Sequence, residues 1–206
     1  MTQPLARPMR LGVFGGAFDP PHLIHRALVE AALAQLQLDR LHIVPTGHAW
    51  HKTRNLSPST HRVAMARLAF SDLPQVRIDT LEVERTGPSY TIDTLRALSS
   101  DNPGAALFLI IGQDQAAALS RWHEWRAIVE MAMICVAGRA DPESDAPAFA
   151  PPQGLQARFQ TLELPISAIS ATDIRHRAGA GLGIDPLVCA PVARYIVLHR
   201  LYQATR

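Results

Sequence analysis

Two glycines and two histidines lie close together near the amino terminus of this 206-residue chain. Gly15 and Gly16 lack side chains, so a ligand can approach the backbone closely there. A helix that begins near Pro21 points its free N–H groups at the same place, which favours an anion. His22 and His25 are three positions apart, so a helix places them on one face. Because imidazoles can stabilise charge that builds up in phosphoryl transfer, the stretch predicts a phosphate-handling site.

The same residues admit other interpretations. The stretch is not the dinucleotide fingerprint G-x-G-x-x-G, because no third glycine stands at the predicted helix start. His22 and His25 could cap the helix or face solvent. They could also bind zinc as a pair, but the sequence offers no evident third ligand.

A second candidate site lies near the carboxyl terminus, in the segment Ile169–Arg175. Ser170 or Thr172 can accept hydrogen bonds from the free N–H groups of a helix start. Arg175 follows within the first turn, and a planar guanidinium suits phosphate oxygens. A capped helix with a solvated arginine is the alternative interpretation.

The elements that must position these residues follow from the apolar pattern, which alternates between short strands and helices. Strands are predicted at 11–14, 41–44, 76–79, 106–111, 132–136 and 159–164. Helices are predicted at 22–38, 58–70, 91–98, 113–120, 122–130, 172–177 and 191–198, with Ser57 as the N-cap of the second. This order predicts an α/β, Rossmann-like, doubly wound parallel sheet. We expect one domain over residues 1–206 with a small C-terminal helical portion at about 170–206.

Composition excludes several classes of protein. A net charge of +2 with no basic run argues against a protein that coats nucleic acid. No apolar run is long enough for a membrane span and no signal peptide is visible, so a cytoplasmic protein is expected. Cys135 and Cys189 have no CxxC partner and are predicted to be reduced, buried thiols. The proline-rich stretch 141–154 is predicted to be a mobile surface loop.

Both candidate sites resemble signatures of the nucleotidyltransferase superfamily. G-G-[ST]-F-D-P-x-H-x-G-H, found in nicotinate and phosphopantetheine adenylyltransferases, is similar to Gly15-Gly16-Ala17-Phe18-Asp19-Pro20-Pro21-His22-Leu23-Ile24-His25. The second signature, I-S-x-T-x-I-R, is similar to Ile169–Arg175 and follows in the family's order. Ala17 replaces a hydroxyl residue and Ile24 replaces a glycine, so any difference in adenine pose is expected at Ile24.

The region between the signatures resembles the bacterial nicotinate-nucleotide adenylyltransferases. The similar segments are Glu84–Leu95, Ile110–Asp114, Leu119–Trp125, Pro45–Lys52 and Val192–Tyr202, so the resemblance covers nearly the whole chain. It implies that the 5′-phosphate of nicotinate mononucleotide attacks the α-phosphorus of ATP. Nicotinate adenine dinucleotide and pyrophosphate would be the products, at a late step of NAD synthesis.

The resemblance also implies the residues of the site. For catalysis these are His22, His25, Lys52 and Arg175. For ATP they are Gly15, Gly16, Ala17, Phe18, Gly112, Asp114, Ser170 and Thr172. For nicotinate mononucleotide they are Tyr90, Thr91, Trp122, His123 and Arg139. Mg²⁺ would arrive with ATP, and no resident metal is expected.

Ordinary roles remain open for several of these residues. Trp122 and Tyr90 could pack in the core, Asp114 could cap a helix, and Arg139 could be a solvated loop residue. The rival functions are an adenylyltransferase for nicotinamide mononucleotide or phosphopantetheine, and a non-catalytic nucleotide-binding regulator. ATP and nicotinate mononucleotide are the expected partners. Nucleic acid and membranes are not, and no pattern predicts an oligomeric state.

Overall fold

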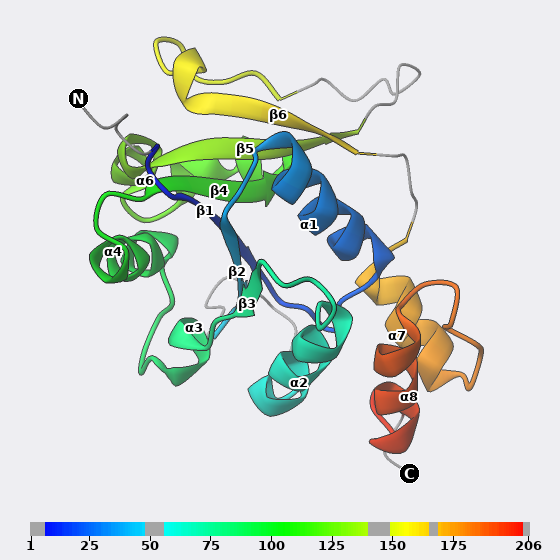
Figure 1. Cartoon of the computed structure of the whole chain (residues 1–206). Helices are drawn as coiled ribbons and strands as arrows, with labels where there is room; N and C mark the ends of the chain where they lie inside the picture. Colours follow the sequence, from blue (N-terminus) through cyan, green and yellow to red (C-terminus); the bar gives the residue numbers. More distant parts are fainter. Residues whose placement is uncertain (1–6, 48–55, 140–148, 165–168, 204–206) are drawn as a thin grey trace, which may run out of the picture.

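The centre of the molecule is a six-stranded sheet in the order β3-β2-β1-β4-β5-β6, and every neighbouring pair of strands is parallel (Figure 1). The computed structural model describes residues 7–47, 56–139, 149–164 and 169–203, without the side chain of Arg139. The strands are β1 (Arg10–Gly16), β2 (Arg40–Pro45), β3 (Val76–Ile78), β4 (Ala106–Gly112), β5 (Ala132–Arg139) and β6 (Phe159–Leu164). The predicted doubly wound parallel sheet is confirmed.

Helices cover both faces of the sheet. One face carries α1 (Leu23–Gln35), α2 (Ser59–Ala69), α7 (Ala171–Gly179) and α8 (Ala190–Leu198), whose apolar side chains share one core cluster. The other face carries α4 (Thr91–Asp101), α5 (Gln113–Ala117) and α6 (Trp125–Met131), which share a second cluster. The connections hold the short helices α3 (Leu81–Glu84), η1 (Leu119–Arg121) and η2 (Gln156–Arg158). Figure 1 shows α7 and α8 side by side near the amino-terminal end of α1.

The central strand β4 shows why the sheet is buried on both sides. Its side chains alternate, so that Phe108 and Ile110 pack in one cluster while Leu109 and Ile111 pack in the other. This period of two follows from the pleat of the strand. An apolar residue at every position is therefore what a strand between two helical layers requires.

The connections reverse direction between β1 and β4. From β1 the chain moves outward through β2 to β3, then returns to place β4 on the other side of β1. The two strands are in register, with Phe14 opposite Ile110. Sheets of this topology bind ligands beyond the carboxyl ends of the strands at such a reversal. Gly15 and Gly16, predicted as a turn, are the last two residues of β1 and pair with β2. Together with the turn that follows they are called the glycine turn, and they meet the segment after β4 at this place.

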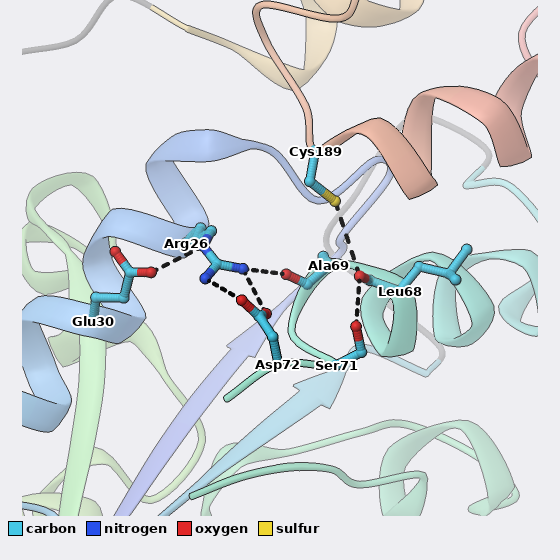
Figure 2. A network of polar contacts seen from close by, with 7 residues as sticks. All are labelled: Arg26, Glu30, Leu68, Ala69, Ser71, Asp72 and Cys189. Atoms are coloured by element: carbon cyan, nitrogen blue, oxygen red, sulfur yellow. Dashed lines mark hydrogen bonds and ion pairs between the residues drawn. The ribbon is translucent and has the colours of Figure 1, made fainter. Parts of the chain in front are cut away.

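A charged contact fixes α1 against the end of α2 (Figure 2). The guanidinium of Arg26 pairs with Glu30 at 2.9 Å and with Asp72 at 2.8 Å, and also donates to the carbonyl oxygen of Ala69. The hydrogen bond from Arg26 holds the pKa of the Asp72 carboxyl below its usual range. The helix α1, which begins at the predicted phosphate-handling turn, is thereby anchored to its neighbour.

Several local predictions need correction. Ser57 is not the cap of α2: the N-cap is Pro58, and the backbone of Ser57 instead donates to Asp19 and accepts from Arg62. The helix predicted to begin at Trp122 begins at Trp125. Cys135 is buried as predicted, but Cys189 is only partly buried, with its sulfur 3.9 Å from the carbonyl oxygen of Leu68 (Figure 2).

Two further sequence predictions concern a surface loop and membrane-spanning segments. The predicted surface loop 141–154 falls largely outside the described residues. Within the ranges that the structure describes, no helix has the length and apolar character needed to cross a membrane.

Candidate active site

The turn after β1 is held by the ring of Phe18. Phe18 has a positive φ of 48°, which is uncommon for a bulky residue, and its side chain is 1% exposed. The ring packs against Phe14 with centroids 5.4 Å apart and against His25 at 5.2 Å. Packing therefore compensates for the unfavourable backbone conformation. Because the ring is buried, the ATP contact predicted for Phe18 would have to come from its backbone.

His22 and His25 lie against each other at the start of α1, as their spacing predicts. Their ring centroids are 3.8 Å apart. The backbone N–H of His22 donates to Nδ1 of His25 at 3.1 Å, so a neutral His25 carries its hydrogen on Nε2. Nδ1 of His22 is buried and has no hydrogen-bond partner among the described residues, and burial lowers the pKa of His22 to about 4. His22 is therefore neutral at pH 7 in the unliganded protein.

Asp19 connects the glycine turn to the carboxyl-terminal helices. Its side chain is 1% exposed and accepts from the hydroxyl of Tyr202 at 2.8 Å and from the backbone N–H of Ser57. Its carbonyl oxygen accepts from Nη1 of Arg175 at 2.9 Å. Asp19 was part of the sequence signature, but nothing in the sequence indicated Tyr202 as its partner.

The second signature forms the start of α7, as predicted. Ser170 is the N-cap, and its hydroxyl accepts from the backbone N–H of Asp173 at 3.1 Å. Nη2 of Arg175 donates to the hydroxyl of Thr172 at 2.9 Å. Together with the contact to Asp19, this bond orients the guanidinium toward the turn after β1. The two signatures are therefore parts of one arrangement.

A cavity of about 470 Å³ opens beyond the carboxyl ends of β1, β2 and β4. Predicted site residues that line it are Gly15, Gly16, Tyr90, Thr91, Asp114, Trp122 and His123. Residues that the sequence did not indicate also line it, among them Thr46, Glu82, Ser89, Thr94, Gln115 and Arg121. Its volume falls in the usual range for small-molecule sites.

The wall of the cavity opposite the glycine turn suits an aromatic anion. Thr91 is the first residue of α4, where N–H groups lack helical partners and the helix dipole favours a negative charge. Trp122 lines the cavity while packing against the second apolar cluster. The ring of His123 stacks on Tyr90, with centroids 4.3 Å apart. Trp122 therefore packs against the core and also lines the cavity, and its contact with a ligand stays a prediction.

Glu82 places a buried carboxyl in this cavity. It accepts from the hydroxyl of Thr94 at 3.0 Å and from the backbone of Gly47, while burial raises its pKa. The fit around Gly47 is tight, because a Cβ there would lie 1.9 Å from the carbonyl oxygen of Glu82. Glu82 belongs to α3, a helix too short for its periodicity to be recognised in the sequence.

The remaining predicted residues do not line the cavity. They are Ala17, Phe18, His22, His25, Gly112, Ser170, Thr172 and Arg175. The carbonyl oxygen of Ala17 accepts from the buried Arg62 at 3.1 Å, and the N–H of Gly112 donates to Gln115. Lys52 and the side chain of Arg139 lie outside the described part of the chain.

Comparison with known proteins shows the family to which this chain belongs. The family described as Cytidylyltransferase-like matches residues 13–177. A relative from Albidiferax ferrireducens, "Probable nicotinate-nucleotide adenylyltransferase", is 56% identical and the alignment covers 94% of this chain and 98% of the relative. A protein of the same name from Methylibium petroleiphilum is 41% identical, with 96% of this chain and 94% of the relative covered.

A solved structure has a similar fold. Nicotinic acid mononucleotide adenylyltransferase of Plasmodium falciparum, complexed with NaAD, superposes with a TM-score of 0.75 at 16% identity. The superposition covers 94% of this chain and 97% of that one. At this identity the likeness concerns the fold alone.

Proposed function

We propose the function of this chain from its family: it belongs to the cytidylyltransferase-like family and, with its relatives, to the nicotinate-nucleotide adenylyltransferases. In the proposed reaction it transfers the adenylyl group of ATP to nicotinate mononucleotide. The products are nicotinate adenine dinucleotide and pyrophosphate, so the enzyme serves NAD biosynthesis. One observation carries the proposal for the site: a single cavity unites Gly15 and Gly16 with Thr91 and Trp122. A phosphate-binding turn and a surface for an aromatic anion are thus neighbours.

The chemistry needs no activated side-chain nucleophile. An oxygen of the acceptor's 5′-phosphate forms a bond to the α-phosphorus of ATP. The bond from that phosphorus to the oxygen bridging to the β-phosphate breaks, and its electron pair leaves with pyrophosphate. A phosphate monoester is already anionic at neutral pH, so no base has to remove a proton. Catalysis then depends on positioning and on stabilisation of developing negative charge.

His22, His25 and Arg175 are proposed for that stabilisation. The hydrogen bond from the backbone of His22 leaves His25 with a donor at Nε2. Burial keeps the imidazole of His22 neutral in the unliganded protein, so it would act as a neutral hydrogen-bond donor. Arg175 is held beside the glycine turn by its bond to Asp19. Lys52 is proposed as a fourth contributor from the resemblance of its segment alone.

The ATP phosphates are proposed to lie between the turn after β1 and the start of α7. Gly15, Gly16, Ala17 and Phe18 would offer backbone atoms there, and Ser170 and Thr172 stand at the helix start that faces an anion. Gly112 and Asp114 would hold the nucleotide's ribose, because a carboxylate accepts hydroxyl hydrogens well. Asp114 is exposed and lines the cavity, which leaves it accessible for that contact.

The acceptor is proposed to occupy the opposite wall. The pyridinium ring would stack on Trp122, since a cation is attracted to the face of an indole. Its carboxylate would meet the N–H groups at Thr91 and His123, and Tyr90 would close the side of the site. Arg139 is proposed to reach a substrate phosphate from the end of β5.

Mg²⁺ is expected to arrive with ATP, held by phosphate oxygens and water. In the described ranges, no three His, Cys, Asp or Glu side chains gather to hold an ion, and Asp19 is already engaged by Tyr202 and Ser57. When bound, the ion would neutralise part of the phosphate charge.

A single domain over residues 1–206 is proposed as well, since Ile174 and Val192 of the C-terminal helices share a core cluster with Phe14 of β1. A cytoplasmic location stays a prediction from the sequence.

Pyrophosphate release with ATP and each acceptor tests the function. Nicotinate mononucleotide should support release at a higher kcat/KM than nicotinamide mononucleotide, and phosphopantetheine should support none. ATP binding without release from any acceptor would instead identify a non-catalytic regulator.

A further inference from the structure

Arg121 is a cation in the proposed acceptor cavity to which the sequence assigned no role. It is the last residue of η1, and it lines the cavity together with Thr91 and Trp122. The cavity lining also includes Asp114 of α5, which ends at Ala117, and Ala118 between α5 and η1. Arg121 therefore belongs to a different turn from Asp114, which follows β4.

No residue in the described part of the chain neutralises the charge of Arg121. Across residues 7–47, 56–139, 149–164 and 169–203, no carboxylate lies within ion-pair distance of it. Other arginines are engaged: Arg96 pairs with Glu124, and Arg26 pairs with Asp72 (Figure 2). Glu82 and Asp114 also line the cavity but form no ion pair with Arg121 in that described part. An exposed guanidinium without a carboxylate partner is available to an anionic ligand.

The acceptor carries a phosphate at one end and a carboxylate at the other. The position of Arg121 in the cavity indicates which of the two it can reach. The 5′-phosphate must approach ATP at the glycine turn, beside Gly15 and Gly16. The nicotinate carboxylate belongs to the ring, for which Trp122 is the proposed surface. Arg121 directly precedes Trp122 and both line the cavity, while Asp114 belongs to the separate helix α5, so the guanidinium is assigned to the ring end.

We propose that Arg121 is a specificity-determining residue that binds the nicotinate carboxylate and so favours nicotinate over nicotinamide mononucleotide. This inference rests on the proposed function. A guanidinium presents parallel N–H donors that match two carboxylate oxygens. A carboxamide offers one oxygen and turns an N–H group toward the same donors, so it loses one bond and gains a repulsion. The preference for nicotinate over nicotinamide mononucleotide then arises from the attraction between the guanidinium and the carboxylate, as well as from the backbone N–H groups at Thr91 and His123.

The test compares kcat/KM for nicotinate and nicotinamide mononucleotide in wild type and in Arg121→Gln. For nicotinate mononucleotide, we expect a fall of roughly tenfold to a hundredfold, the range for loss of a hydrogen bond to a charged group. The value for nicotinamide mononucleotide should not fall comparably, because the variant removes one favourable bond and one repulsion together. Arg121→Lys should restore part of the preference because it keeps the charge. The matched control is Arg126→Gln, an exposed cation over the ring of Trp125 that does not line the cavity.

Three results would overturn the inference while leaving the proposed function intact. They are equal falls for both acceptors in Arg121→Gln, no change for either, and a wild-type enzyme that shows no preference. Equal falls would indicate that the guanidinium binds the phosphate that both acceptors share. If wild type released no pyrophosphate with nicotinate mononucleotide, the proposed function would fail, and this inference with it.

Discussion

Arg175 donates through Nη1 to the carbonyl oxygen of Asp19 at 2.9 Å, although the two residues are 156 positions apart. The bond connects the signature after β1 to the signature at α7. It places a guanidinium beside the glycine turn without using the carboxylate of Asp19, which accepts from Tyr202 instead. Two sequence motifs that each predict a phosphate site therefore lie in contact with each other.

Tyr202→Phe should destabilise the protein, because it removes a donor from the buried carboxylate of Asp19. We expect the free energy of unfolding to fall by about 1.5–3 kcal/mol, the usual contribution of a hydrogen bond to a charged group. Urea unfolding measures it. The control is Tyr195→Phe, which removes a half-buried hydroxyl that is hydrogen-bonded to His61. Its free energy of unfolding should fall by less. Equal stability of Tyr202→Phe and wild type would contradict this account of Asp19.

His25→Ala should lower kcat by roughly 10²-fold or more, about 2.7 kcal/mol of transition-state stabilisation. The reason is the loss of the donor at Nε2, which the bond between His22 and His25 leaves facing away from the backbone. Steady-state kinetics on the folded variant measures the effect, with exposed His199→Ala as the control. An unchanged kcat would remove His25 from the mechanism.

The stability of the protein should depend on His22 between pH 4 and pH 6.5. Burial lowers its pKa from 6.5 to about 4, so in this window the unfolded chain binds a proton that the folded chain does not. The free energy of unfolding therefore falls as pH decreases. At about 1.36 kcal/mol per pKa unit, the contribution is at most roughly 3 kcal/mol.

Urea unfolding of wild type and His22→Gln at several pH values tests this dependence. The variant should lose less stability than wild type on acidification from pH 6.5 to pH 4. Parallel curves for the two proteins would show that His22 does not titrate as its burial implies.

Gly15→Ala should impair nucleotide binding without affecting the fold. A Cβ at Gly15 meets nothing within 4 Å, but the residue lines the cavity, where ATP phosphates are expected. We expect KM for ATP to rise by roughly tenfold to a hundredfold, because a small displacement of a reactant is costly. Gly183→Ala is the matched control, since its Cβ also meets nothing within 4 Å and it does not line the cavity. The same KM in both variants would contradict a close approach of ATP to Gly15.

Much of the fold could be predicted because the signals for it are local. The unbroken apolar run in β4 indicated a strand covered on both faces, and the hydroxyl of Ser170 indicated a helix start. The helix α3 was missed because four residues carry no periodicity, and Ser57 was misassigned because its backbone is used by Asp19 and Arg62. Local preference fails where a distant group offers a better hydrogen bond.

The sequence by itself determined the six strands, the longer helices between them, the two signatures and the family that they resemble, since each depends on residues near one another in the chain. Only the tertiary structure decided which distant groups meet. It brought Tyr202 to Asp19 and placed Glu82 and Arg121 in one cavity with Trp122. The physical reason is that hydrogen bonds and charges act over a few ångströms of space, while the strand order β3-β2-β1-β4-β5-β6 sets which segments come that close.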